Sequence, residues 1–197
     1  MDNKYNKIVD FLFETGMLAK TPRSGFSFLG SGEQSVAEHS NRTTYIGYVL
    51  AEMIEEADVS KVIQMCMFHD IAEARVSDLN YVHQKYTERH ENKAVKDLTD
   101  SLPFGNKIKN LIHEYEERES LEAKIAKDAD NLEFLLSLKE QKDIGNKRAE
   151  TWIPSLVKRI KTEEARDLAE KIIKRDSDNW WFHDKDDEWW VSRNSGK

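Results

Sequence analysis

The fold is decided by the stretch VIQMCMFHDIAEA, residues 62–74. Its first half is apolar almost all round, and a helix of that kind is covered by other helices on every side. The apolar run then meets His69 and Asp70. An ionised carboxylate in such surroundings is costly unless it is paired or bound to a cation. We therefore expect a helical bundle with a polar site near its centre.

Helical periodicity continues outward in both directions from this stretch. Residues 4–18 place Tyr5, Ile8, Phe11 and Leu12 on one stripe, which predicts a helix that faces the core. The segment Ser35-Val36-Ala37-Glu38 is a capping box that starts the next helix. Further helices are expected at about 59–73, 86–101, 106–117, 120–142, 147–161 and 163–175. The pattern predicts an all-α fold, a single-domain helical bundle of about seven to nine helices over residues 1–175.

Two segments interrupt the helical pattern. Residues 19–34 contain three glycines, one proline and three serines, and a loop of that length is more often functional than a short one. The tail, 176–197, is acidic and rich in tryptophan: residues 176–190 hold six acids, one lysine and four of the five tryptophans. Clustered tryptophans mark an interface, so we expect the tail to pack on the core or on a second subunit.

Composition excludes several classes of protein. The chain has 197 residues, and 30 Lys plus Arg against 37 Asp plus Glu give 30 − 37 = −7, which disfavours a binder of nucleic acid polymers. A single cysteine, Cys66, excludes an internal disulfide. No apolar run approaches the roughly 18 residues of a membrane span, and the N-terminus does not resemble a signal peptide. The sequence predicts a soluble cytoplasmic protein without a membrane partner.

The pair His69-Asp70 is the first candidate for chemistry. Taken alone, such a pair is more often a salt-bridged helix end than a metal site. Three other residues shift the balance: His39 in the first turn of the preceding helix, Asp130 on a later amphipathic helix, and Glu73 one turn after His69. Mixed nitrogen and oxygen ligands suit one divalent cation such as Mn, Co, Fe, Zn or Mg. The sequence therefore favours a metal site inside the bundle.

The order His39, His69-Asp70, Asp130 resembles the H…HD…D signature of the HD-domain metal-dependent phosphohydrolases. The surrounding residues resemble the subfamily of 5′-nucleotidases that act on (deoxy)nucleoside monophosphates. The similar segments are Pro22-Arg23-Ser24-Gly25, Ser35 to His39, His69 to Glu73 with Ser77-Asp78-Leu79, and Glu114-Tyr115-Glu116 followed by Glu122-Ala123-Lys124 and Lys127 to Asp130. The resemblance covers about residues 5–140, and the last fifty residues lie outside the part that carries it.

The resemblance implies a role for each matching residue. It implies His39, His69, Asp70 and Asp130 as metal ligands, Glu73 and Asp78 as catalytic acids, and Arg23 and Glu38 as substrate contacts. It also implies a nucleotide substrate, hydrolysis to nucleoside and phosphate, and a homodimer. Which of the two catalytic acids serves the water and which the leaving oxygen stays open.

Two positions depart from the family pattern. Ser77 stands where glycine is common before the aspartate. Ser24 follows Arg23 where some members carry a large aromatic residue near the sugar, so a strict preference for deoxyribose is not implied.

The sequence also allows other substrates and another function, and it predicts the roles of several other polar residues. A cyclic or pyrophosphorylated nucleotide is an alternative substrate, and a non-catalytic nucleotide- or metal-sensing module is an alternative function. Surface roles are expected for His83, His90 and His113, with His83 or His90 as less favoured ligands of a second metal. Asp128 is expected to point away from Asp130 into solvent or a salt bridge.

Overall fold

A computed structural model describes residues 2–184 and 186–192, and this part of the chain forms helices and no strand. The all-α prediction is confirmed. The helices of nine or more residues are α1 (Asp2–Thr15), α3 (Val36–Glu52), α4 (Val59–Phe68), α6 (Glu91–Thr99), α7 (Gly105–Glu117), α8 (Leu121–Asp143), α9 (Lys147–Val157) and α10 (Glu163–Lys174). The shorter ones are α2 (Gly25–Leu29), α5 (Glu73–Val76) and α11 (Glu188–Ser192).

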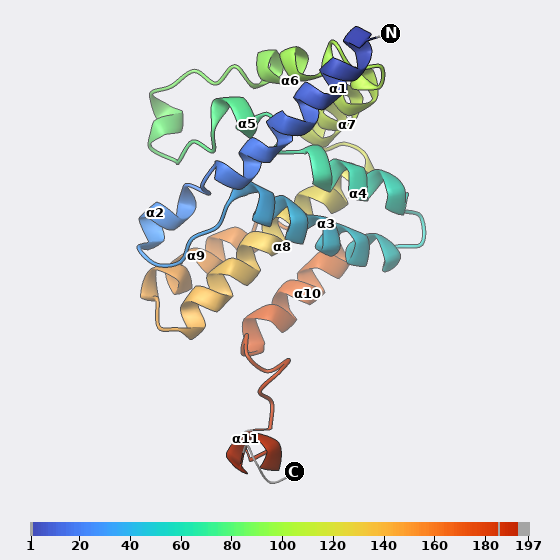
Figure 1. Ribbon diagram of the computed structural model, residues 1–197. Coiled ribbons are helices and arrows are strands. Elements are labelled where there is room, and N and C mark those ends of the chain that lie inside the picture. The colour runs from blue at the N-terminus through green and yellow to red at the C-terminus, as the bar shows by residue number, and fades with distance from the viewer. Residues whose placement is uncertain (1, 185, 193–197) are drawn as a thin grey trace.

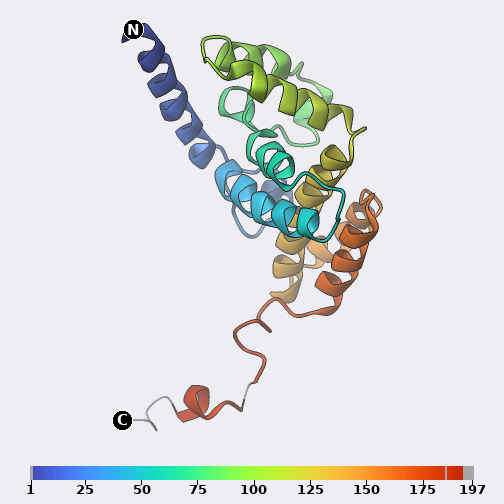
Figure 2. The ribbon, with the colours of Figure 1, turned by 90° about the vertical axis from the view of Figure 1, so that its right-hand side faces the viewer.

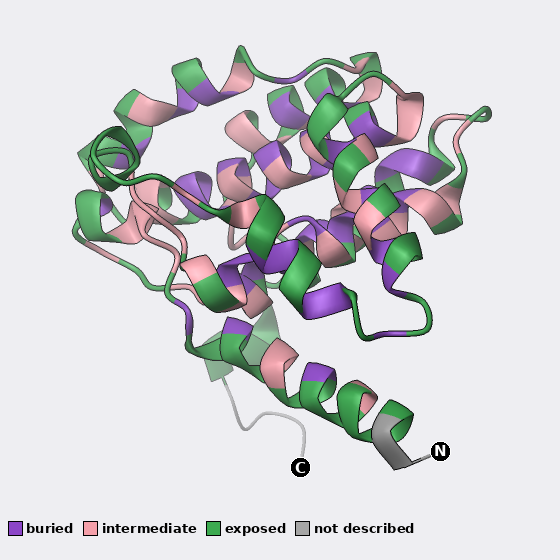
Figure 3. Ribbon diagram, turned by 90° about the horizontal axis from the view of Figure 1, so that it is seen from above, coloured by how far each residue is buried: buried purple, intermediate pink, exposed green. Residues whose placement is uncertain are grey.

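Helix α8 is the central element (Figure 1). It is the longest helix of the described residues and packs against α3, α4, α7, α9 and α10. Its apolar residues Ile125, Leu132, Leu135 and Leu138 are almost completely buried. Seen from above, buried residues lie mainly in the interior of the bundle and exposed residues on its outside (Figure 3). The core therefore lies around α8, and the polar groups that α8 carries are brought into the interior with it.

Helix α4 ends earlier than its sequence pattern predicts. The expected helix at about 59–73 stops at Phe68, residues 69–72 form turns, and α5 begins at Glu73. No glycine or proline marks this stop, so the pattern contained no signal for it. The interruption falls on the His69-Asp70 pair.

The apolar stripe of α1 faces the core over only part of its length, so the prediction is confirmed for Ile8 and Phe11 and wrong for Tyr5 and Leu12. Phe11 is buried against Ile71 and Leu98, whereas Tyr5 is 66% exposed and Leu12 60% exposed. Figure 2 shows α1 leaning away from the bundle along one side. The part of α1 around Phe11 packs against residues of α6 and α7, and the rest of the helix extends past the edge of the core.

Asp128 is fully buried, which contradicts the expectation of a solvated side chain. Its carboxylate accepts hydrogen bonds from the backbone N–H groups of Lys161 and Thr162 at 2.7–3.1 Å and from the Thr162 hydroxyl at 2.8 Å. These N–H groups belong to the two residues that precede α10, of which Thr162 is the N-cap, and a helix has no internal acceptors for its first donors. Asp128 on α8 thus holds the beginning of α10 in place through hydrogen bonds.

The acidic tail runs away from the bundle (Figures 1 and 2). Trp180 is 80% exposed and Trp189 is 74% exposed, while Trp181, Phe182 and Trp190 pack on one another. Within the described residues, the predicted packing on the core is limited to the first part of the tail, where the Ser177 N–H donates to Asp143 at 2.8 Å. Packing on a second subunit stays a prediction. Residues 185 and 193–197 of the tail lie outside the described residues.

None of the helices in the described part of the chain combines the length and the apolar character needed to cross a membrane.

Candidate active site

The start of α3 fixes His39. Ser35 precedes the helix, and its hydroxyl accepts a hydrogen bond from the Glu38 N–H at 3.2 Å. The Glu38 carboxylate accepts from the Ser35 N–H at 2.6 Å, so the predicted capping box is confirmed. His39 follows directly and is fully buried. Because the helix start is held on both sides, the imidazole enters the interior at a defined position.

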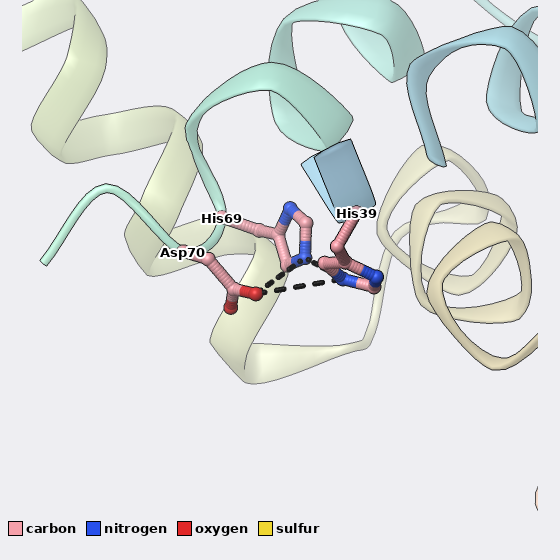
Figure 4. Close-up of side chains that lie close together, drawn as sticks. All are labelled: His39, His69 and Asp70. Atoms are coloured by element: carbon pink, nitrogen blue, oxygen red, sulfur yellow. Dashed lines mark hydrogen bonds and ion pairs between the residues drawn. The ribbon is translucent and has the colours of Figure 1, made fainter. Parts of the chain in front are cut away.

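The early end of α4 brings His69 and Asp70 to the same point. In a continuous helix, adjacent side chains point about 100° apart. The turn at residues 69–72 removes this restriction, and His69 Nε2 lies 3.2 Å from Asp70 Oδ2. Both side chains point toward His39, as Figure 4 shows.

Four side chains converge here from α3, the α4–α5 turn and α8. His39 Nε2 lies 3.2 Å from His69 Nε2, 3.5 Å from Asp70 Oδ2 and 3.3 Å from Asp130 Oδ1. Ligand atoms at about 2.1 Å from one shared ion stand at comparable separations from each other. His39, His69 and Asp70 therefore offer ligand atoms that all lie within 4.8 Å of one another, with spacings that fit a single cation, and Asp130 lies beside this group through its 3.3 Å contact with His39.

The outer ring nitrogens of both histidines are occupied. His69 Nδ1 donates to the Cys66 carbonyl at 2.8 Å, and His39 Nδ1 donates to Glu133 Oε2 at 2.6 Å. In the neutral rings this leaves a lone pair on each Nε2, and the two lone pairs face each other and two carboxylates. An arrangement with outer nitrogens held by acceptors and inner nitrogens free is typical of metal-binding histidines.

The electrostatics of this cluster require a positive charge. Burial alone would lower the pKa of His39, yet its hydrogen bonds with Asp130 and Glu133 raise that pKa to about 9. Burial would also raise the pKa of Asp130, but Lys127 and His39 hold it well below its usual range. Either a proton or a cation must sit among these acceptors, and the donor set suits a borderline or hard divalent ion.

Glu133 is a site residue that the sequence reading missed. It is fully buried, and besides His39 it binds Arg42 Nε at 2.9 Å and Gln34 Nε2 at 2.7 Å. It lies three residues after Asp130 on α8, which places both carboxylates on one face of the helix. That spacing, together with Arg42 three residues after His39, was the available signal.

A cavity of about 840 Å³ opens above the cluster. Asp70 and Asp130 form part of its floor, and Arg23, Glu73 and Asp78 also line it. Arg23 Nη1 lies 3.4 Å from Asp70 Oδ2 and 3.9 Å from Asp78 Oδ2. The loop before α2, which holds Arg23, thus delivers a cation to the cavity next to the carboxylates.

Glu73 and Asp78 reach the cavity in different ways. Glu73 is buried, and burial together with repulsion from Asp70 and Asp78 raises its pKa to about 9. Its Oε2 has no hydrogen-bond partner among the described residues. Asp78 accepts a 2.8 Å hydrogen bond from the Ser24 N–H. Both carboxyl groups are thereby positioned at the cavity, whose lining also includes Asp70 and Asp130.

The residue before Asp78 has an unusual backbone. Ser77 has φ 64° and ψ 163°, a region in which essentially only glycine is comfortable. This conformation turns the chain so that Asp78 faces the loop around Ser24. The serine at this position is therefore strained, which explains why glycine is common there in the family pattern.

Several predicted residues stay outside the cavity. Glu38 is exposed and occupied by the capping box, so the structure does not bring it to Arg23. His83, His90 and His113 do not line the cavity, and His83 contacts Asn80 at 3.0 Å while His113 pairs with Glu117 at 3.4 Å. Cys66 is buried, and burial raises the pKa of its thiol, in keeping with a core residue.

Comparison with known proteins finds a matching family model and similar relatives that agree with each other. The family model for the HD domain matches residues 15–173. The 5′-deoxynucleotidase HDDC2 of Bos taurus is 30% identical over 146 residues, which are 71% of this chain and 70% of the relative. The 5′-deoxynucleotidase hdd1 of Schizosaccharomyces pombe is 30% identical over 166 residues, which are 76% and 82% of the two chains.

Solved structures share the fold. A conserved hypothetical protein from Pyrococcus furiosus superposes with a TM-score of 0.72 at 28% identity, covering 85% of this chain and 99% of that one. A protein titled predicted metal-dependent phosphohydrolase, from Magnetospirillum magnetotacticum, has a TM-score of 0.70 at 24% identity, with coverages of 87% and 92%. The family match reaches beyond residue 140 and includes α9 and α10, so the similarity extends further along the chain than the motifs alone indicated.

Proposed function

The chain belongs to the HD domain family, and on that basis we propose that it is a metal-dependent phosphomonoesterase that hydrolyses (deoxy)nucleoside 5′-monophosphates to nucleoside and phosphate. The observation that carries the proposal is the convergence of His39, His69, Asp70 and Asp130 beneath a cavity that also holds Arg23. The names of the relatives at about 30% identity support the nucleotide as substrate.

The proposed metal ligands are the four converging residues, which would hold one divalent ion. Such an ion lowers the pKa of water and polarises phosphoryl oxygens. Arg23 would neutralise part of the charge of the phosphate, because its guanidinium lies in the cavity within 4 Å of both Asp70 and Asp78. Burial alone would lower the pKa of Arg23, but the surrounding carboxylates raise it, so the cation is permanent.

Glu73 and Asp78 are the proposed groups for proton transfer. Ester hydrolysis requires that a water loses a proton and that the departing 5′-oxygen gains one. Both carboxyl groups line the same cavity, one buried and the other tied to the Arg23 loop. They can therefore serve opposite sides of one phosphate, and the assignment of each role is left to their separate pH profiles.

The test is hydrolysis of a panel of phosphate esters by protein stripped of metal and then reloaded with Mn²⁺ or Co²⁺. We expect release of phosphate from 5′-monophosphates only after reloading. Glu73→Gln and Asp78→Asn should each lower kcat by about 100-fold or more while the metal stays bound. Glu117→Gln, on an exposed surface of α7, is the matched control.

The panel also separates the alternatives. Hydrolysis of cyclic or pyrophosphorylated nucleotides in preference to monophosphates would replace the proposed substrate. Bound metal without hydrolysis of any ester would leave the sensing module, and full activity without metal would refute the proposal. Ribose and deoxyribose forms of each nucleotide are compared because Ser24 leaves the sugar preference open.

Three expectations from the sequence and the resemblance stay predictions: a substrate contact by Glu38, a homodimer, and a cytoplasmic location. The first is measured by the KM of Glu38→Gln and the second by light scattering.

A further inference from the structure

One side of the cavity is aromatic and takes no part in the phosphate chemistry. Phe26 of α2, Phe134 of α8 and Trp152 of α9 line it, and all three are half-buried against the core. The rings of Phe134 and Trp152 have centroids 6.4 Å apart at an interplanar angle of 52°. Each ring thus has one part fixed by the core and another part that borders the cavity.

This aromatic wall lies at a short, fixed distance from the metal-ligand cluster. Phe134 follows Asp130 by one helical turn on α8, a rise of about 6 Å. A methyl group on Gly25, two residues after Arg23, would lie 3.7 Å from the Phe134 ring, an ordinary van der Waals contact, so the Arg23 loop passes beside this ring. A phosphate held beside Arg23 and Asp130 therefore places the remainder of its molecule within reach of the wall.

One of the cationic side chains that line the cavity has no acidic partner among the residues that the structure describes. Three of its cationic side chains have acidic partners in the same cavity, namely Arg23 with Asp70 and Asp78, Lys127 with Asp130, and Arg89 with Glu73. Arg159, just past the end of α9, also lines the cavity, and its guanidinium makes no hydrogen bond or ion pair with the residues that the structure describes. Arg159 is exposed at the cavity, so its donors are available to a ligand without competition from a carboxylate.

We propose that α9 and the turn after it form the nucleobase subsite of this cavity. Trp152, with Phe134, packs on the flat face of the base, and Arg159 donates to acceptor atoms on the edge of the base. An arginine matches two adjacent acceptors best, and guanine presents such a pair in O6 and N7. The subsite therefore favours guanine nucleotides over adenine nucleotides, because adenine presents an amino donor beside N7 and no two adjacent acceptors. This inference rests on the proposed function, because it assigns the part of the substrate that the phosphate chemistry leaves undefined.

An aromatic wall favours a base over a second phosphate at this end of the cavity. Stacking of a base on an aromatic side chain is favourable and removes apolar surface from water. A second phosphate beside the same rings would lose hydration without gaining a polar partner from them. A single arginine at the rim completes a base subsite, whereas phosphate sites are built from several donors.

The experiment compares deoxyguanosine 5′-monophosphate, deoxyadenosine 5′-monophosphate and 2-deoxyribose 5-phosphate, which has no base. Trp152→Leu should raise the KM of both nucleotides by about ten-fold or more and leave the sugar phosphate unchanged. Arg159→Gln should lower kcat/KM for the guanine nucleotide about ten-fold and that for the adenine nucleotide by less than about two-fold. Lys158→Gln, the exposed neighbour, is the control.

Several outcomes would overturn the subsite. Equal loss on the sugar phosphate and the nucleotides would show that Trp152 is only structural, and Phe134→Leu and Trp152→Phe repeat the comparison if Trp152→Leu does not fold. Wild-type protein that hydrolyses nucleotides no better than the sugar phosphate would refute the subsite while the proposed function stands. If it hydrolyses no 5′-monophosphate at all, the proposed function itself fails. An effect of Arg159→Gln confined to nucleoside 3′,5′-bisphosphates would reassign Arg159 to a phosphate.

Discussion

Glu133 offers the sharpest test of how the cluster is held together. Its carboxylate accepts a 2.6 Å hydrogen bond from His39 Nδ1 and does not line the cavity, so it acts only through the histidine. Glu133→Gln keeps the shape of the side chain and removes its charge. We expect the variant to fold, to bind divalent metal more weakly, and to retain the arrangement of Glu73 and Asp78.

The magnitude follows from the electrostatics of the buried pair. Burial raises the pKa of Glu133, but the hydrogen bond and charge of His39, followed by the charge of Arg42, lower it from its ordinary 4.5 to about 2. This corresponds to roughly 3 kcal/mol in favour of the ionised carboxylate. Loss of such an outer partner weakens metal binding by about 10- to 100-fold. A loss of about 2–3 kcal/mol in stability would lower the Tm by roughly 5 °C or more.

The assay is calorimetric titration of metal-free protein with Co²⁺, combined with thermal unfolding at several pH values. A lowered pKa gives stability that is fully present above about pH 5 and is lost as the pH falls toward 2, so wild type and variant should converge on acidification. Glu140→Gln is the control, because Glu140 also pairs with Arg42 at 2.7 Å but is exposed and does not touch His39. A variant with the affinity and Tm of wild type would refute the role given to Glu133.

Two further predictions concern protons and the fold. Because the pKa of His39 is raised to about 9, its ring is protonated at pH 7 in the absence of metal. Metal binding at Nε2 should therefore release about one proton, and the affinity for metal should rise with pH up to about pH 9. Calorimetry in buffers of different ionisation enthalpy measures the number of protons released. Release of no proton would contradict the charge assigned to this ring. Asp128→Ala removes the acceptor for the start of α10 and should destabilise the protein by about 3 kcal/mol in denaturant unfolding, with kcat/KM unchanged. Asp167→Ala on the exposed face of α10 is its control, and equal stability of the two variants would show that Asp128 does not hold the helix.

The sequence was most informative where one local interaction determines the structure. The capping box at Ser35 and Glu38 correctly located the start of α3, and the period of apolar residues located the long helices. The His-Asp pair and the two distant ligands were found because metal chemistry restricts the residue types at such a site. Their convergence at 3.2–3.5 Å could not be derived from spacing, since it depends on how α3 and α8 pack.

The errors have a shared physical cause, which is tertiary context. Nothing local distinguishes the exposed stripe of α1 from a core face, because burial depends on where the other helices end. Asp128 was read from helical phase relative to Asp130, without the knowledge that α10 returns to cover that side of α8. The aromatic wall comes from α2, α8 and α9, which lie far apart in the sequence, so only the fold reveals that Trp152 borders the cavity.

The distribution of the proposed ligands over three segments of the chain has a thermodynamic consequence. The proposed ligands come from three segments, and His39 and His69 are separated by 30 residues of chain and Asp70 and Asp130 by a further 60. An ion bound among them would close two long loops at a single point, as a covalent cross-link would, and would stabilise the fold by as much as it binds the folded chain more tightly than the unfolded one. The metal would then stabilise the tertiary structure as well as take part in the reaction. The folding equilibrium of this protein would consequently depend on the concentration of free metal around it.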